Sequence, residues 1–173
     1  NAAGSLYKPQ NAQALGIKDA DHLSIEWPRA VAWKGQLINA FTKNIGLLVK
    51  GNLGDHLSGS VKFTGKNAAE VTLPDGKKEA VEFDQAIIAT GSQPISIPGF
   101  AIDGKDVLGS KEALDLTEPP KGLVVIGGGV IGLEIGTLFA KIGTKVTVVE
   151  FLDALLPVIE KDLVTPVSRV LRR

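Results

Sequence analysis

Residues 123–150 read LVVIGGGVIGLEIGTLFAKIGTKVTVVE, and this stretch decides the fold of the chain. The continuous apolar run at 123–126 is typical of a strand buried in a parallel sheet, and 145–149 predicts a second such strand. Between the two strands, apolar side chains recur on one face of a helix. These side chains are Ile131, Ile135, Leu138, Phe139 and Ile142. Gly143 follows where a helix C-cap glycine is expected, so the stretch predicts a βαβ unit of Rossmann type in an α/β fold.

The turn between the first strand and the helix matches the pattern G-x-G-x-x-G. The matching residues are Gly127, Gly128, Gly129, Val130, Ile131 and Gly132. The pattern follows an apolar strand, opens a helix and precedes a second strand that ends at an acidic residue, Glu150. That full context predicts a dinucleotide-binding site, and the alternative is a βα turn that binds nothing.

The glycines of this pattern have separate expected roles. Gly127 permits the tight turn, Gly129 leaves bare backbone for a pyrophosphate, and Gly132 lets the helix pack close to the strand. The N-terminus of the helix offers unpaired N–H groups and a partial positive charge to the phosphates.

Glu150 is expected to select the cofactor. At the end of the second strand its carboxylate would accept hydrogen bonds from the adenosine ribose hydroxyls. It would also repel the 2′-phosphate of NADP, and the next residues, Phe151 and Leu152, provide no Arg to neutralise that phosphate. The sequence therefore predicts NAD rather than NADP. Glu134, near the start of the helix, indicates by itself only compensation of the helix dipole.

An apolar stripe farther upstream predicts a long helix. Its members, four residues apart, are Trp33, Leu37, Phe41 and Ile45. Pro28 suits the first turn of such a helix, and we expect the aromatic side chains of the stripe to lie in a core. Residues 1–26 show no clear period and predict a loop or a ragged helix.

Short elements follow this helix. A small antiparallel β-meander is expected from strands at about 60–65, 69–73 and 79–83, with a turn at Pro74-Asp75-Gly76. The run AIIA at 86–89 predicts a buried strand. Further expected features are a short helix at 111–116, a domain boundary at Pro119-Pro120 and an amphipathic helix at 158–171.

Charge and composition exclude several functions. Lys plus Arg and Asp plus Glu both number 19, which gives no electrostatic reason to expect a nucleic acid or an anionic membrane as partner. The apolar runs are too short for a membrane span, and residues 1–10 lack the blocks of a signal peptide. His22 and His56 are taken as surface residues. Arg169, Arg172 and Arg173 are taken as a charge set at a helix C-terminus.

Two residue types are missing from the chain. The absence of Cys excludes disulfides, thiolate metal sites and thiol catalysis by these 173 residues. The absence of Met indicates that the sequence does not begin at a natural start codon. We therefore expect a piece of a longer protein, and the alternative is a complete small domain that lost its initiator Met.

Several segments resemble the dihydrolipoamide dehydrogenase type of the flavoprotein disulfide oxidoreductase family. The run LVVIGGGVIGLE at 123–134, continuing to VTVVE at 146–150, is similar to the opening of that family's NAD domain. AIIATGSQPISIP at 86–98 resembles the segment where the chain leaves the FAD domain. VKFTG at 61–65 and the Leu156-Pro157 step are similar to the family as well.

The resemblance implies a two-cofactor enzyme. In that family FAD takes two electrons from dihydrolipoamide through a cysteine pair and passes them as hydride to NAD. Carried over to this chain, the glycines of the pattern and Glu150 would hold NAD, and Glu134 would lie near the nicotinamide and the flavin. Thr90, Gly91 and Ser92 match the motif that lies against FAD. Val61 stands where the family often has a small residue near the adenine, so that contact is not carried over.

Departures from the family limit what the chain is expected to do alone. The family's first glycine pattern for FAD, its cysteine pair and its dimerisation domain with the catalytic His–Glu pair have no counterpart here. We therefore expect no catalytic residue and no reductase activity in the isolated chain, which should aggregate or stay partly molten. Residues 1–118 are assigned to an FAD-binding domain and residues 119–173 to the first half of an NAD-binding domain.

The parent is expected to be a homodimer in the cytoplasm or an organelle matrix. It would oxidise dihydrolipoamide on the acyltransferase of a 2-oxo acid dehydrogenase complex. Two alternatives stay open at this point: a flavoenzyme of the NADH oxidase or peroxidase type, and a non-enzymatic NAD-binding module.

Overall fold

The computed structural model describes residues 24–171 and divides into two compact units. Of the described residues, 24–34 and 94–171 belong to one unit, and Gly35–Gln93 form the other. The expectations for most of residues 1–26, for His22 and for Arg172 and Arg173 lie outside the described residues. None of the helices in the described range is both long and apolar enough to cross a membrane.

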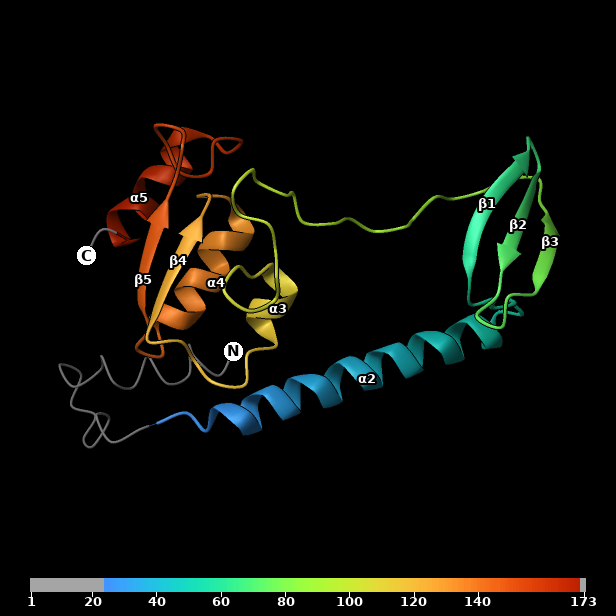
Figure 1. Cartoon of the computed structure of the whole chain (residues 1–173), viewed down its shortest axis with the longest axis horizontal. Coiled ribbons are helices and arrows are strands. Elements are labelled where there is room, and N and C mark those ends of the chain that lie inside the picture. The colour runs from blue at the N-terminus through green and yellow to red at the C-terminus, as the bar shows by residue number, and fades with distance from the viewer. Residues whose placement is uncertain (1–23, 172–173) are drawn as a thin grey trace. The chain divides into compact units, whose positions relative to one another are not determined.

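The first unit contains the predicted βαβ arrangement. β4 (Gly122–Ile126) and β5 (Lys145–Val149) pair in parallel, and α4 (Val130–Ala140) connects them. Figure 1 shows the two strands side by side with α4 against them and α3 (Ser110–Leu114) next to α4. The α/β class and the βαβ unit are thus confirmed.

Burial in the βαβ unit alternates along its strands, as a pleated sheet with one covered face requires. Val125 and Val146 turn toward α4, whereas Val124 on the other face is 62% exposed. On α4, Leu133 is buried and Phe139 has no exposed surface. The core of this unit therefore lies between α4 and one face of the strand pair.

The helical face that contacts the sheet differs in part from the predicted one. Ile131 belongs to the predicted apolar face but is 62% exposed. The contact is made instead along Gly132 and Gly136. A Cβ built at Gly136 would lie 3.3 Å from Val146 Cγ1 and 3.5 Å from Val125 Cγ2. The small residues let the helix approach the strands, so they decide which face is inward, and the bulkier Ile131 is left outside.

The start of the long helix belongs to the same unit. α2 (Trp27–Gly51) begins at Trp27, which is buried, and the indole Nε1–H donates to the Leu116 carbonyl oxygen at 2.8 Å. The indole centroid lies 5.6 Å from that of Phe139. Two turns further on, Lys34 Nζ is 2.6 Å from Asp115 Oδ1. These contacts tie the first turns of α2 to the βαβ core.

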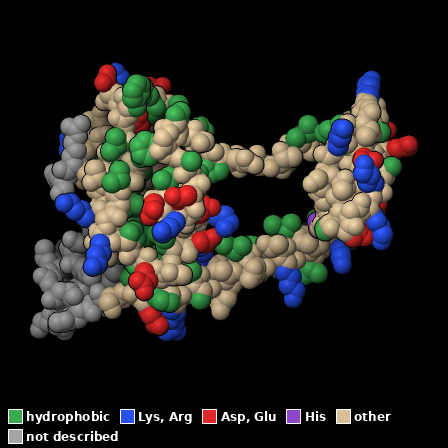
Figure 2. Space-filling view, viewed as in Figure 1, with side chains coloured by type: hydrophobic (Ala, Val, Ile, Leu, Met, Phe, Trp, Pro, Cys, Tyr) green, Lys and Arg blue, Asp and Glu red, His purple; other side chains and the backbone are tan. Residues whose placement is uncertain are grey.

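The expected burial of the aromatic stripe on α2 is wrong for the described structure. Trp33 is 59% exposed and Phe41 is 65% exposed, and hydrophobic side chains show on the visible surface in Figure 2. An amphipathic stripe is buried only where a second apolar surface meets it. In the smaller unit, the described strands do not pack along the stripe.

The predicted β-meander forms in the second unit. β1 (Ser60–Gly65), β2 (Ala68–Thr72) and β3 (Lys78–Glu82) make an antiparallel sheet in the order β1-β2-β3. The turn between β2 and β3 is closed by the Gly76 N–H, which donates to Leu73 O at 2.9 Å. Gly76 has a φ of +83°, a left-handed conformation that favours glycine.

The buried strand expected at 86–89 is absent from the described structure. These residues form no strand or helix, and Ile87 and Ile88 are 95% and 71% exposed. A buried strand needs neighbours that satisfy its backbone N–H and C=O groups. None of the described strands pairs with 86–89, so the apolar sequence stays extended and exposed.

The segment between the two expected domains is held to the βαβ unit. Thr144 is buried, and its hydroxyl donates to Pro120 O at 2.8 Å. The two compact units meet at other positions along the sequence and do not divide the chain near residue 118. A domain boundary after residue 118 therefore stays a prediction. After β5, α5 (Lys161–Leu171) begins three residues later than expected, because a turn over 156–159 comes first, closed by the Ile159 N–H on Leu156 O at 2.8 Å.

Candidate dinucleotide-binding site

The glycine turn lies at the carboxyl end of the strand pair. Gly127 follows β4 directly with a φ of +102°, which an L side chain rarely adopts. Its N–H donates to Val149 O at 2.8 Å, across to the last residue of β5. The turn and the end of β5 are thus joined at the sheet edge where ligands bind in open α/β sheets.

Two glycines of the pattern face different surroundings. A Cβ at Gly132 would lie 2.8 Å from Gly127 O and 2.9 Å from Val125 Cγ1, closer than real Cβ atoms approach. Gly132 is therefore glycine because helix and strand touch there. Around Gly129 a Cβ would meet nothing within 4 Å, and its φ of −78° suits any residue. Nothing within the chain requires Gly129 to lack a side chain.

The N-terminus of α4 presents free backbone donors. The first helical bond runs from Leu133 N–H to Gly129 O at 3.0 Å, so the N–H groups of Val130, Ile131 and Gly132 have no partner inside the helix. No side chain caps α4, and no acidic residue stands in its first turn. These donors and the positive end of the helix dipole can bind an anion.

The carboxylate of Glu150 is held by backbone N–H groups on both sides. Its Oε2 accepts from Gly128 N–H at 2.6 Å, and its Oε1 accepts from Leu152 N–H at 2.8 Å. The Leu152 bond, followed by the Gly128 bond, holds the pKa of the Glu150 carboxyl below its ordinary value of 4.5. The group is therefore an anion at neutral pH, fixed beside the glycine turn.

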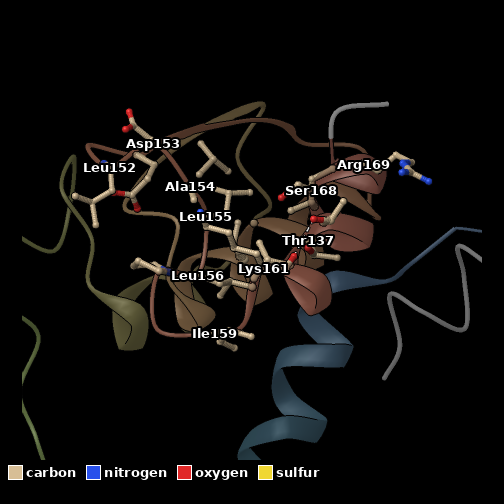
Figure 3. Close-up of a pocket in the computed structure, with 18 of the residues that line it drawn as sticks. Thr137, Leu152, Asp153, Ala154, Leu155, Leu156, Ile159, Lys161, Ser168 and Arg169 are labelled. Atoms are coloured by element: carbon tan, nitrogen blue, oxygen red, sulfur yellow. Dashed lines mark hydrogen bonds between the residues drawn. The ribbon is translucent and has the colours of Figure 1, made fainter.

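An apolar groove of about 1120 Å³ lies beneath the helices of this unit. It is lined by side chains of α4, β5, the segment after β5 and α5. Figure 3 shows Leu155, Leu156 and Ile159 among side chains from α4 and α5, such as Thr137 and Lys161. Of the predicted site residues only Glu150 lines the groove. Because none of the glycines of the turn lines the groove, we do not assign it to the dinucleotide.

The remaining predicted residues are not assembled into this site. Thr90, Gly91 and Ser92 lie in an exposed extended segment of the second unit. Within the described range these three residues form no hydrogen bond and no enclosed cradle, so they do not fit FAD by themselves. Glu134 is exposed on α4, and it has no ion-pair partner among residues 24–171.

Sequence reasoning missed the segment that follows Glu150. Leu156 donates its N–H to Gly128 O at 2.9 Å, and Leu155 contacts the Cβ direction of Gly128. Pro157 follows these leucines, but it does not predict the contact with Gly128, because that contact depends on how 151–157 folds back.

The sequence matches the family described as pyridine nucleotide-disulphide oxidoreductase over residues 6–173. It is 37% identical over 171 residues to the dihydrolipoyl dehydrogenase of Halobacterium salinarum, covering 97% of this chain and 35% of that protein. It is 36% identical over 173 residues to a dihydrolipoyl dehydrogenase of Bacillus subtilis, covering 100% of this chain and 36% of that protein.

Solved structures resemble the chain over nearly its whole length. LpdA from Mycobacterium tuberculosis superposes with a TM-score of 0.85 at 24% identity, covering 98% of this chain and 37% of that one. The HOCl-induced flavoprotein disulfide reductase RclA from Escherichia coli superposes with a TM-score of 0.68 at 26% identity, covering 96% and 36%. The chain thus spans little more than a third of the length of the proteins it matches.

Proposed function

The chain belongs to the pyridine nucleotide-disulphide oxidoreductase family, and on that basis we propose that it supplies NAD-binding machinery to a dihydrolipoyl dehydrogenase. Relatives of that name match the whole chain at 36–37% identity. The observation that carries the proposal is the open space in front of Gly129, with free helix N–H groups on one side and Glu150 on the other.

The residues of the turn fit NAD in separate ways. Gly129 leaves room for the pyrophosphate, and the N–H groups at the start of α4 would donate to its oxygens. The Glu150 carboxylate would accept from the ribose hydroxyls and disfavour a 2′-phosphate. Bound NAD supplies a hydride acceptor, while the chain itself binds and orients the dinucleotide. Glu134 is proposed to lie near the nicotinamide, on the family resemblance alone.

Membership of the family, and not a site formed by the described residues, is what supports FAD as a cofactor. Thr90, Gly91 and Ser92 would lie against FAD, in a domain that we place at residues 1–118, with the NAD domain starting at 119. Because those three residues make no cradle among the described residues, we derive no step through the flavin.

The whole enzyme is proposed to oxidise dihydrolipoamide carried by the acyltransferase of a 2-oxo acid dehydrogenase complex. The names of the relatives support this substrate and this partner. A homodimer in the cytoplasm or an organelle matrix is the proposed setting, on the same resemblance.

The test uses Gly129→Val in the full-length protein. A branched side chain at this position meets nothing in the chain, so the protein should lose only the N-cap preference for glycine, about 1 kcal/mol of stability, but the side chain fills the space proposed for the pyrophosphate. We expect the affinity for NADH to fall by several kcal/mol if the steric clash cannot relax. Binding is measured by calorimetric titration, and FAD content by absorbance, which should stay at the wild-type level.

Two outcomes would contradict the proposal. A wild-type protein that binds no NADH or ADP-ribose would remove the function altogether. Unchanged NADH affinity in Gly129→Val would reduce the glycine pattern to a structural turn.

A further inference from the structure

Gly128 is the middle glycine of the turn, at a position the dinucleotide pattern leaves open. Its backbone is not left-handed, so no conformational demand requires glycine there. Its Cα nevertheless lies against other groups: a Cβ would contact Leu155 Cδ2 and would lie 3.1 Å from Glu150 Oε2 and 3.5 Å from Glu150 Cβ. Neighbouring side chains would thus have to move to admit a side chain at this position, in contrast to the open space at Gly129.

Both backbone polar groups of Gly128 bond to residues at or after the end of β5. The Gly128 N–H donates to Glu150 Oε2 at 2.6 Å, and the Gly128 carbonyl accepts from Leu156 N–H at 2.9 Å. Leu156 has a φ of +51°, an uncommon conformation for a branched residue. The chain after β5 therefore folds back onto this one residue.

The bonds leave the Glu150 carboxylate half occupied. A carboxylate has about four lone-pair sites, two on each oxygen. Gly128 N–H uses one site on Oε2, and Leu152 N–H uses one on Oε1. The Phe151 N–H makes only a smaller contribution to the lowered pKa of Glu150. Each oxygen thus keeps acceptor capacity beyond its one close hydrogen bond, which suits the two neighbouring hydroxyls of a ribose.

From this geometry we infer that Gly128 is a positioning residue for the nucleotide: it fixes the Glu150 carboxylate so that its two free acceptor sites meet the 2′- and 3′-hydroxyls of the adenosine ribose. The inference rests on the proposed function. It assigns the preference for NAD to a pair of residues, the anion Glu150 and the bare glycine that orients it.

A small change at Gly128 should act on binding more than on folding. The contact with Leu155 is to the end of a flexible side chain, which can turn away, whereas Glu150 Oε2 at 3.1 Å must shift to admit a methyl group. Gly128→Ala should therefore fold and carry FAD, but hold the carboxylate in a displaced position.

The experiment compares Gly128→Ala, Glu150→Gln and the double variant in the full-length protein. Calorimetric titration with ADP-ribose and with 2′-phospho-ADP-ribose measures binding without any need for turnover. In Gly128→Ala we expect the Kd for ADP-ribose to rise roughly tenfold, about the effect of one hydrogen bond to a charged group. The Kd for the 2′-phosphate analogue should change less than about twofold. The preference of the protein for ADP-ribose over this analogue should therefore fall by a factor of roughly five to ten.

The double variant tests whether Gly128 acts through Glu150. If it does, the double variant should bind ADP-ribose no more weakly than Glu150→Gln alone, because the two changes remove one shared interaction. Gly46→Ala is the matched control, since Gly46 lies on α2 with nothing within 4 Å of its Cβ direction. It should leave both Kd values unchanged.

Each failure has a distinct meaning. Additive losses in the double variant, or an unchanged preference in Gly128→Ala, would overturn the positioning role while leaving NAD binding in place. Absence of ADP-ribose binding by the wild type would overturn the proposed function itself.

Discussion

The βαβ unit and the segment at 86–98 begin with similar apolar sequence and reach opposite states. In the first, β4 pairs with β5 and Phe139 is fully buried. In the second, Ile87 remains 95% exposed in an extended chain. The βαβ unit brings its own partner strand within a few turns of helix, whereas 86–89 pairs with none of the described strands. An apolar run therefore becomes a strand only where the chain supplies a neighbour.

The same difference separates the two sets of predicted site residues. Gly127 and Glu150 come together because strand pairing places the ends of β4 and β5 at one edge. The segment Thr90, Gly91 and Ser92 matches the family motif, but among the described residues no other part of the chain forms a site around it. Matched substitutions at buried and at exposed positions should therefore differ in how much stability they cost.

The largest effect is expected for Phe139→Ala. This ring has no exposed surface, so its removal should cost about 3–5 kcal/mol of stability. The matched control is Phe151→Ala, because Phe151 is 98% exposed and should change stability by less than about 0.5 kcal/mol. Urea unfolding followed by tryptophan fluorescence measures both. Equal losses would remove the distinction between the buried and the exposed ring.

A second pair compares two helical glycines. Gly132→Ala adds a methyl group 2.8 Å from Gly127 O and 2.9 Å from Val125 Cγ1, and overpacking of this kind costs about 1–3 kcal/mol. Gly46→Ala adds a methyl group in open space on α2 and should stabilise by up to about 1 kcal/mol. Shifts of the urea midpoint in opposite directions are expected. A stabilising Gly132→Ala would mean that α4 and β4 can separate freely.

A third pair compares two threonine hydroxyls. Thr144 is buried and donates to Pro120 O, so Thr144→Val should cost about 1–2 kcal/mol by leaving that carbonyl without its donor. Thr42 is exposed and donates to Ile38 O within α2, so Thr42→Val should cost less than about 0.5 kcal/mol. Thermal melts measure the loss of stability in both variants. If Thr144→Val does not lower the melting temperature, the hydrogen bond to Pro120 O contributes nothing to stability.

The smallest effect is expected from acid. The pKa of Glu150 is lowered in the folded protein by the N–H groups of Leu152 and Gly128. Its contribution to stability is therefore complete above the ordinary value of 4.5 and is lost as pH falls through the lowered folded-state pKa. Glu150→Gln should lose less stability over that range than the wild type does. Acid unfolding of the wild type and of Glu150→Gln is followed by circular dichroism. Identical unfolding profiles of the two proteins would show that the Glu150 carboxylate contributes nothing to stability.

Local features of the fold could be predicted from the sequence. The family resemblance is confirmed by the match over residues 6–173. The strands of the meander and of the βαβ unit lie within about a residue of their predicted positions, because alternation and turn residues such as Gly76 act over short distances. The cofactor roles of Gly129 and Glu150 stay predictions, although their geometry suits NAD.

Features that depend on a distant partner could not be predicted. The strand at 86–89 and the burial of Trp33 both required a neighbouring surface that the periodicity of the sequence does not specify. Burial of Trp27 was overlooked because a single aromatic residue before Pro28 carries no period. The contact of Leu155 with Gly128 depends on how 151–157 folds back, and the sequence of those residues does not predict this contact.

The indole of Trp27 has a consequence for the order of folding. Its bond to Leu116 joins residues 89 positions apart, and the whole second unit, Gly35–Gln93, lies inside that loop. Closing a flexible loop of this length costs about 4 kcal/mol plus a constant, more than one hydrogen bond and one ring contact return. Trp27 should therefore dock only after the meander and the βαβ core have formed separately. During synthesis Trp27 must wait until Phe139 and then β5 have emerged and the βαβ core has formed, so the first turns of α2 should become native only after that core.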